Sequence, residues 1–177
     1  MRDDIAIRPL DATEAGARLG DLADILVEAV AQGASVNFMA GFSRGEAMAF
    51  WRDQVSGIGK GGRHLIVAED GGRLVGTVVL TLAPQPNAPH RAEVGKMLVR
   101  PEWRRRGLGR RLLAAAEARA LAAGRTLLLL DTESGSGGDR LYRSCGWTEY
   151  GRVPGHAFTP DGRLAETTMF YKRLAER

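Results

Sequence analysis

A basic, glycine-containing segment from Val99 to Leu113 has the residue types and spacing best suited to chemistry. It reads V-R-P-E-W-R-R-R-G-L-G-R-R-L-L, so an apolar strand pattern leads into arginines around Gly107 and Gly109 and then into a helix pattern. A helix N-terminus presents unpaired backbone N–H groups and a partial positive charge. Glycines let a phosphate approach that backbone closely, and arginines add charge-assisted hydrogen bonds. The segment therefore predicts a phosphate-binding loop.

The charge distribution indicates what kind of phosphate compound this loop binds. Between Arg100 and Arg111 there are six arginines and one glutamate, whereas the net charge of the whole chain is only +4. One focus of positive charge suits a small polyphosphate better than a nucleic-acid duplex, which is contacted at many phosphates. The Lys-Ser/Thr pair of a P-loop and the third glycine of the dinucleotide fingerprint are both missing. We expect no nucleic-acid partner.

The elements around the loop form a strand–helix–strand unit. Residues 107–123 carry the clearest helix pattern of the chain, with Leu108, Leu112, Ala116 and Ala120 on one face. Strand patterns precede this helix at 92–99 and follow it at 126–131. Because a helix joins the two strands, they are expected to lie parallel in one sheet.

The remaining elements predict a single α/β domain covering residues 1–177. A first helix is expected from Asp11 or Thr13 to about Gln32, and a second from Ser43, which forms a capping box with Glu46, to about Ile58. A short helix is expected at 139–145. Further strands are expected at 64–69, 73–82, 148–154 and 167–172, the first two joined by a D-G-G hairpin turn.

Composition excludes several other classes of protein. The 177 residues are 44% hydrophobic and 26% charged, as in ordinary folded domains. Cys145 is the only cysteine, so neither an intrachain disulfide nor a cysteine-rich zinc site can form. The three histidines lack ligand spacing, so no metal is expected. No apolar run reaches the length of a membrane span, and the first ten residues lack an apolar signal region. We expect a cytoplasmic protein with no membrane partner.

Two motifs, in order, resemble the GCN5-related N-acetyltransferases, the GNAT family. Arg104-x-x-Gly107-x-Gly109, between a strand and a helix, is similar to the pyrophosphate loop of that family. The stretch L-Y-R-S-C-G-W, which ends at Trp147, is similar to its L-Y-x-x-x-G-F segment. Four more stretches, beginning at Gly33, Arg91, Leu130 and Pro160, resemble a toxin-resistance member of the family.

The resemblance implies a fold and a co-substrate. The fold is a mixed, mostly antiparallel sheet with flanking helices, in which one parallel pair of strands splays apart and holds acetyl-CoA. The pantetheine arm is expected along the backbone of Met97, Leu98 and Val99. The diphosphate is expected on the loop, with the binding residues being Arg104, Arg105, Arg106, Gly107, Leu108, Gly109 and Arg110. Transfer is expected to be direct, so Cys145 need not act as a nucleophile.

Such a transfer needs a base and an acid. An amine attacks only when it is neutral, so a carboxylate must take its proton directly or through water. Glu93 and Asp131 are both candidates, and the choice between them stays open. Alternation along a strand predicts that Glu93 shares a face with Met97 and Val99. Tyr142, in the second motif, could donate its hydroxyl proton to the leaving thiolate.

The acceptor is expected to be a primary amine on a small molecule, with a toxin or antibiotic as one possibility. The irregular stretch between the first two helices offers acceptor contacts, namely Ser35, Asn37, Phe38 and Met39. Two alternatives stay open: a protein or peptide N-acetyltransferase, and a catalytically silent acyl-CoA-binding regulator. The sequence is compatible with a monomer or a homodimer.

Overall fold

A seven-stranded mixed sheet with the strand order β1-β2-β3-β4-β5-β7-β6 organises the computed structural model, which describes residues 5–175. The strands are β1 (Ala6–Leu10), β2 (Arg63–Asp70), β3 (Arg73–Leu82), β4 (Arg91–Val99), β5 (Leu127–Glu133), β6 (Thr148–Phe158) and β7 (Leu164–Arg173). The helices are α1 (Ala12–Ala17), α2 (Leu19–Ala31), α3 (Arg44–Gly59), α4 (Leu108–Ala122) and α5 (Gly137–Ser144), with a 3₁₀ turn at Pro101–Trp103.

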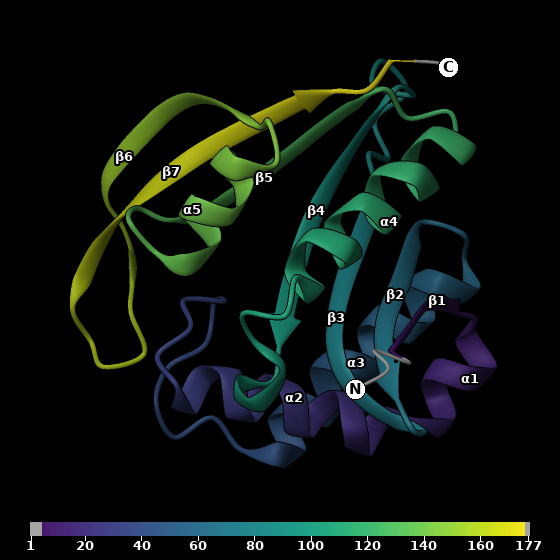
Figure 1. Cartoon of the computed structure of the whole chain (residues 1–177), viewed down its shortest axis with the longest axis vertical. Coiled ribbons are helices and arrows are strands. Elements are labelled where there is room, and N and C mark those ends of the chain that lie inside the picture. Colours follow the sequence, from purple (N-terminus) through teal and green to yellow (C-terminus); the bar gives the residue numbers. More distant parts are fainter. Residues whose placement is uncertain (1–4, 176–177) are drawn as a thin grey trace.

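The parallel pair predicted around the glycine loop is present and splays apart. Strands β4 and β5 run parallel and pair over three positions, from Arg91 opposite Leu127 to Glu93 opposite Leu129. The other neighbouring strands are antiparallel. Beyond Glu93 the two strands diverge, and Figure 1 shows the wedge that opens between them.

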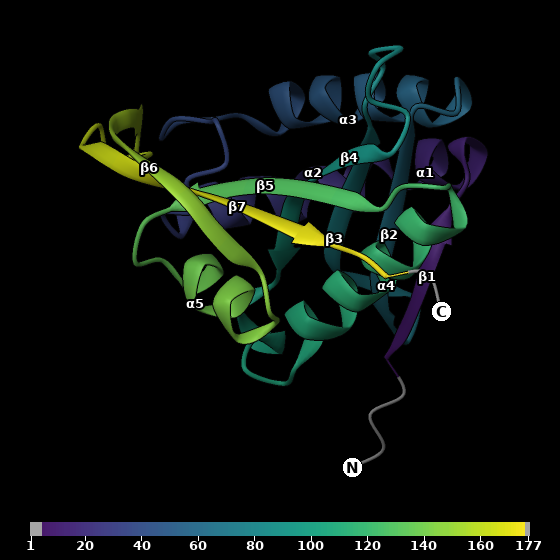
Figure 2. The ribbon, with the colours of Figure 1, turned by 90° about the horizontal axis from the view of Figure 1, so that it is seen from above.

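Helices cover both faces of the sheet. Figure 2 shows α2 and α3 on one face and α4 and α5 on the other. Two apolar clusters fill these layers. The first lies under α4 and α5 and includes Leu112, Leu128 and Phe170. The second lies under α2 and α3 and includes Leu26, Trp51 and Leu65. The opening between β4 and β5 is thus framed by a helical layer on each side.

Local signals account for most helix starts. Asp11 and Ser43 each cap a helix, and each forms a capping box with the glutamate three residues later, Glu14 and Glu46. The prediction of one helix from residue 11 to 32 is wrong in one respect, because the chain breaks at Arg18 into α1 and α2. Gly16 and Gly20 flank this break, and glycine lowers the stability of a helix interior.

Two strand predictions also need correction. The edge strand β1 was not expected, because it has five residues and contains Pro9. An edge position tolerates a proline, since its outer side needs no ladder donor. Strand β6 continues past Pro154 to Phe158 instead of ending there, again on a sheet edge, with register shifts towards β7.

Candidate active site

The wedge between β4 and β5 contains a cavity of about 820 Å³. Its walls come from four segments that lie far apart in the sequence: residues 94–99 of β4, the loop and first turn at 107–110, residues 131–133 of β5, and residues 136–142 around α5. Residues 32–36, after α2, close one side. The structure therefore brings the glycine loop, the strand before it and the tyrosine motif into one site, as the sequence predicts.

A β-bulge at Lys96 shapes the β4 wall. Thr77 lies opposite Leu98 while Val79 lies opposite Gly95, so β4 has one extra residue here. Lys96 has φ 47°, a conformation that L-residues rarely adopt. The Thr77 hydroxyl donates a 2.9 Å hydrogen bond to the Lys96 carbonyl oxygen. The bulge turns the strand where it begins to separate from β5.

This bulge overturns the predicted alternation along β4. Met97 and Val99 pack against the cluster under α4, as Ala92 does, whereas Leu98 packs in the cluster under α2 and α3. Glu93, which alternates with Ala92, consequently faces away from Met97 and Val99. The physical reason is the extra residue at Lys96, because one inserted residue reverses the faces of everything after it.

The glycine loop has the geometry at Gly107 that suits close approach of a ligand to the backbone. This residue caps α4 with φ 76°, and a Cβ built there would meet only open space. Gly109 has a different role, since a Cβ there would lie 3.0 Å from Leu141 Cδ2 on α5. Gly109 therefore lets α5 pack close to the start of α4, while Gly107 keeps the backbone bare towards the cavity.

The arginines of the loop divide into two groups. Arg104, Arg105 and Arg110 line the cavity, whereas Arg106 is exposed and is not part of its lining. The Arg104 guanidinium donates to the Val99 carbonyl oxygen at 2.9 Å, and Arg110 donates to Ser144 Oγ at 3.1 Å. An arginine that sequence reasoning did not single out, Arg140 of α5, also lines the cavity.

The two candidate carboxylates occupy different places. Asp131 lines the cavity from β5. Glu93 is exposed at the last paired position of β4 and lies outside the lining. Glu133, two residues after Asp131 on the same strand, also lines the cavity and forms a 2.8 Å ion pair with Arg163. Glu133 was missed because the predicted strand ended at Asp131.

Tyr142 lies in the wall that α5 contributes. Its ring is 7% exposed and contacts Trp147 and Phe170, each at a centroid distance of 6.0 Å. Burial raises the pKa of Tyr142 far above its usual value, and the charge of Asp131 raises that pKa further. The hydroxyl therefore keeps its proton at neutral pH and is available as a donor.

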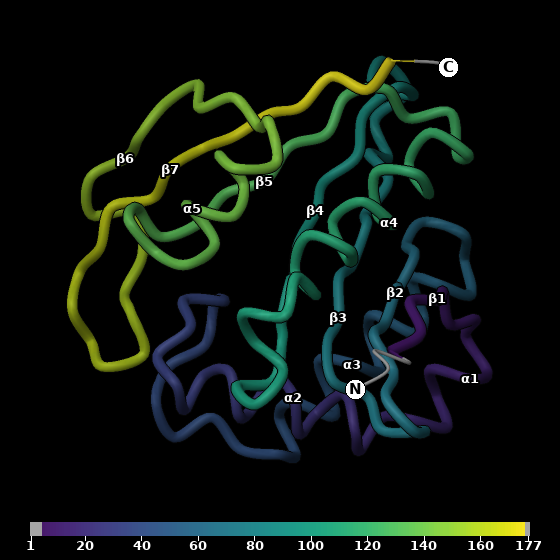
Figure 3. The backbone as a smooth tube through the Cα atoms, in the orientation of Figure 1, coloured from purple at the N-terminus to yellow at the C-terminus, as the bar shows by residue number. Residues whose placement is uncertain are grey.

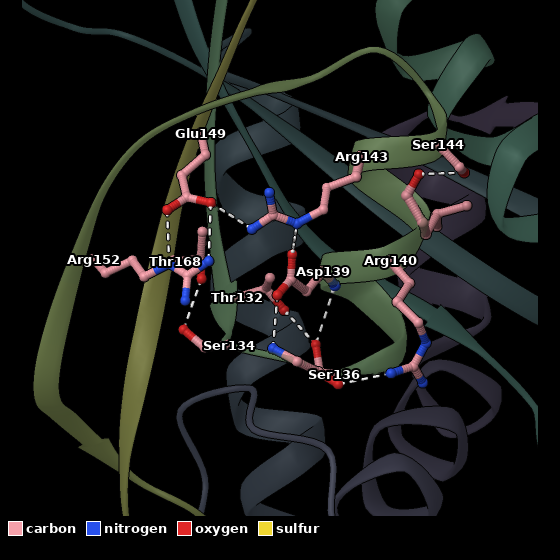
Figure 4. A network of polar contacts seen from close by, with 12 residues as sticks. Thr132, Ser134, Ser136, Asp139, Arg140, Arg143, Ser144, Glu149, Arg152 and Thr168 are labelled. Carbon is pink, nitrogen blue, oxygen red and sulfur yellow. Dashed lines mark hydrogen bonds and ion pairs between the residues drawn. The ribbon is translucent and has the colours of Figure 1, made fainter.

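A polar network fixes the helix that carries Tyr142. Figure 4 shows Asp139 between the loop before α5 and Arg143. The Asp139 carboxylate accepts from the Gly135 backbone N–H and from Arg143 Nε, both at 2.6 Å, and Ser136 Oγ accepts from the Asp139 N–H at 3.1 Å. The bond to Ser136 caps the N-terminus of α5, and the two bonds to the Asp139 carboxylate tie the helix to the loop before it and to its own last turn.

A second cavity of about 430 Å³ adjoins the first. It lies among the end of α2, residues 40–42 and the β6–β7 turn, and it shares Gly33 and Glu133 with the first cavity. Figure 3 shows the loop after α2 reaching the β6–β7 turn. The Ala40 N–H donates to the Pro160 carbonyl oxygen at 2.9 Å, which ties the two segments together.

Of the four residues expected to contact the acceptor, one lines a cavity. Ser35 lines the larger cavity, whereas Asn37, Phe38 and Met39 belong to the lining of neither. Phe38 stacks on Phe42 at 4.0 Å instead, and Met39 is 48% exposed at the surface. Asn37, just before them, takes a left-handed conformation with φ 72°.

Sequence reasoning also missed Lys96, which lines the larger cavity. Its ammonium lies over the rings of Phe38 and Phe50, at 5.8 and 5.3 Å from their centroids. Burial lowers the pKa of Lys96, and the charge of Asp131 opposes that shift. A basic residue in a bulge of a strand has no signature in the local sequence, so no pattern could have found it.

A sequence model of the acetyltransferase (GNAT) family matches residues 28–147, more than half of the chain. The chain belongs to this family. As a GNAT protein it is an acyl-CoA-dependent N-acetyltransferase, and the family resemblance of its two motifs is confirmed. Within residues 5–175, no cluster of His, Cys, Asp and Glu could hold a metal ion, and no helix is both long and apolar enough to cross a membrane.

Solved acetyltransferase structures share this fold. A phosphinothricin acetyltransferase from Sinorhizobium meliloti, in complex with acetyl-CoA, has a TM-score of 0.79 at 21% identity, over 97% of this chain and 89% of that one. A ribosomal-protein-alanine N-acetyltransferase from Brucella melitensis has a TM-score of 0.77 at 23% identity, over 96% of this chain and 99% of that one. An N-acetyltransferase from Staphylococcus aureus Mu50 has a TM-score of 0.80 at 16% identity, over 98% of this chain and 100% of that one. The predicted α/β fold with a splayed parallel pair is confirmed.

Proposed function

We propose that this protein transfers the acetyl group of acetyl-CoA directly to a primary amine of a small molecule. The observation that carries the proposal is the wedge itself. One cavity combines a bare helix N-terminus, a strand edge freed from pairing, a carboxylate and a buried tyrosine. The first two features suit a diphosphate and a pantetheine amide, and the last two suit proton transfer.

The residues present fit acetyl-CoA. Beyond Glu93, β4 has no partner in β5, so the backbone of Met97, Leu98 and Val99 can pair with the pantetheine arm. The amides from Arg105 to Arg110, with guanidinium groups of Arg104, Arg105 and Arg110, would hold the diphosphate. When bound there, acetyl-CoA supplies an activated acetyl group.

Asp131 is the carboxylate best placed to act as the general base. It lines the cavity, whereas Glu93 lies outside it, at the closed end of the wedge. Asp131 would take the proton of the acceptor amine, directly or through water. Tyr142, held protonated by burial, would give a proton to the leaving sulfur. The side chains of Arg106 and Glu93 lie outside the cavity lining, so neither side chain is given a direct role in binding or proton transfer here.

A small acceptor is favoured over a peptide by the contact between two loops. The Ala40–Pro160 hydrogen bond joins the segment after α2 to the β6–β7 turn across the acceptor side. A peptide substrate needs an open groove at this place. The joined loops leave instead the 430 Å³ cavity, which is the size of a small molecule.

The proposal extends to a resistance role. Four stretches resemble the tabtoxin resistance protein: G-A-S-V-N-F-M-A, R-A-E-V-G-K-M-L-V, L-D-T-E-S-G-S and P-D-G-R-L. Each of the four contributes to the walls of the two cavities. Acetylation of a toxin would remove its ammonium charge and hydrogen-bond donors. We propose a cytoplasmic location, consistent with a single, free cysteine.

Two measurements test this function. Calorimetric titration with acetyl-CoA is expected to show binding in the wild type and a large loss in Gly107→Glu, whose carboxylate would enter the space of the diphosphate. An amine panel of amino acids, antibiotics and peptides, scored by thiol release from acetyl-CoA, is expected to give turnover with a small amine. Binding without any turnover would support the silent-regulator alternative, and turnover with peptides alone would support a protein acetyltransferase.

A further inference from the structure

We infer that Lys96 recognises an anionic group of the acceptor, and that the acceptor is an α-amino acid or a close analogue with a carboxylate beside its amine. The inference rests on the proposed function, since it concerns the amine substrate of the same cavity. It adds a specificity-determining residue and a substrate class.

Lys96 lies apart from the cations that face the diphosphate. Arg104, Arg105 and Arg110 belong to the loop and the first turn of α4. Lys96 projects instead towards Phe38 and Phe50, which pack against the cluster under α2 and α3. Its ammonium is therefore on the face of the sheet where the two loops close over the cavity. No part of the acetyl-CoA site described above uses this charge.

Asp131 provides the complementary charge on the same face. Leu128 and Leu130 pack in the cluster under α4, so Asp131 alternates to the face of α2 and α3. Its charge acts on Lys96, yet among the described residues no ion pair joins the two, and neither has another ion-pair partner. One cavity is thus lined by a lysine and an aspartate that are not paired with each other.

The backbone conformation of Lys96 is a second, independent observation that favours a functional role for this residue. Its φ of 47° is unfavourable for a residue with a side chain, and glycine would adopt it without strain. Gly95 stands next to it in the sequence. A lysine at this strained position adds a cationic residue to the cavity lining at an energetic cost, and strained residues of this kind cluster at functional sites.

An α-amino acid matches this arrangement. Its ammonium would lie beside Asp131, which takes the proton, and its carboxylate would lie beside Lys96. The positive charge of Lys96 would also favour the neutral form of the amine, the form that attacks. A simple amine lacks the carboxylate and would gain no charge-assisted hydrogen bond from Lys96, so it is expected to bind more weakly.

The test uses matched pairs of ligands, namely L-α-amino acids and phosphinothricin on one side and their α-carboxamides on the other. Binding to the CoA-saturated enzyme is measured by calorimetry, so it does not depend on turnover. The best-bound acid is expected to bind ten- to a hundredfold more tightly than its amide, as for a hydrogen bond to a charged group. This preference is expected to vanish in Lys96→Met, to return in Lys96→Arg and to persist in Lys60→Met, which removes an exposed lysine at the end of α3.

The outcomes separate this inference from the proposed function. Equal binding of acid and amide, an equal effect of Lys96→Met on both, or no binding of any acid would overturn the inference, even if other amines are acetylated. An acid preference that depends on Lys96, together with no acetylation of any amine, would support the inference and contradict the proposed function. Unchanged acetyl-CoA affinity in Lys96→Met shows that this variant is folded.

Discussion

The hydroxyl of Thr77, fully buried on β3, donates a hydrogen bond to the carbonyl oxygen of Lys96 on β4. This bond lies at the extra residue of the bulge, where the faces of β4 are exchanged. It links a buried core position to the wall of the active site. The bulge is therefore held by the core of the sheet and does not depend on a bound substrate.

Thr77→Val keeps the shape of the side chain and removes this donor. The Lys96 carbonyl loses its partner, so we expect a loss of about 1–3 kcal/mol in the free energy of unfolding, measured by urea denaturation. We also expect weaker acetyl-CoA binding, because the backbone beside Met97 shifts. Thr168→Val is the control, since it removes the hydrogen bond between a buried threonine of β7 and Ser134, the residue after β5. Thr168→Val is expected to lower the free energy of unfolding without changing the affinity for acetyl-CoA. An equal loss of acetyl-CoA affinity in both variants would contradict the role of the bulge.

Gly107→Ala tests the phosphate loop with less disturbance than a charged substitution. Alanine at φ 76° costs about 1–2 kcal/mol, so the melting temperature is expected to fall by a few degrees. Because Gly107 lines the cavity, the added methyl is expected to hinder the approach of the diphosphate and to raise the Kd for acetyl-CoA at least tenfold. Gly124→Ala at the other end of α4, with φ 70°, carries similar strain away from the site. It is expected to lower the melting temperature without changing the Kd.

Tyr142→Phe is expected to lower kcat about a hundredfold, within the range for a lost general acid, while the Kd for acetyl-CoA stays within twofold. Stopped-flow thiol release and calorimetry measure the two quantities. Wild-type turnover in this variant would remove Tyr142 from the mechanism.

The raised pKa of Tyr142 has a spectroscopic consequence. An ordinary tyrosine has a pKa near 10 and is about nine-tenths ionised at pH 11, whereas Tyr142 is expected to keep its proton there. Tyrosinate absorbance gained between pH 8 and pH 11 should thus be the same in wild type and Tyr142→Phe. A lower gain in the variant would show that Tyr142 ionises normally. Because its folded pKa is raised, the stability that it contributes is complete below about pH 10 and falls as the pH rises further.

Asp131→Asn and Glu93→Gln separate the two carboxylates. Asp131 lines the cavity and Glu93 does not, so kcat/KM at pH 7 is expected to fall at least a hundredfold in Asp131→Asn and less than threefold in Glu93→Gln. Full pH–rate profiles of both variants check this. A larger loss of kcat/KM in Glu93→Gln than in Asp131→Asn would instead identify Glu93 as the base, acting through water.

The sequence predicted the parts of the site that depend on local signals. Gly107 and the apolar face of α4 lie next to each other in the chain, so the loop and its helix were found with nearly the observed ends. The bulge at Lys96 could not be found in this way, because it depends on Thr77 and on the register of β3. The alternation assigned to Glu93 failed for the same reason.

The acceptor side was the least predictable part. The conformation of the loop after α2 depends on stacking between Phe38 and Phe42 and on the backbone bond from Ala40 to Pro160. The second of these contacts joins segments more than a hundred residues apart, so residue types alone could not say which loop side chains reach the cavity. Glu133 was missed because the strand continues past the aspartate that seemed to end it on sequence grounds.

Three paired positions hold β4 to β5, so the sheet consists of two plates that share one short seam. One plate, β1 to β4 with α4, bears the glycine loop at Gly107. The other, β5 to β7, bears the aspartate, the glutamate and the turn beside the smaller cavity. Under the proposed function, substitutions in the second plate are expected to alter the choice of amine more than the affinity for acetyl-CoA, so that selection could change the substrate while the donor site is kept.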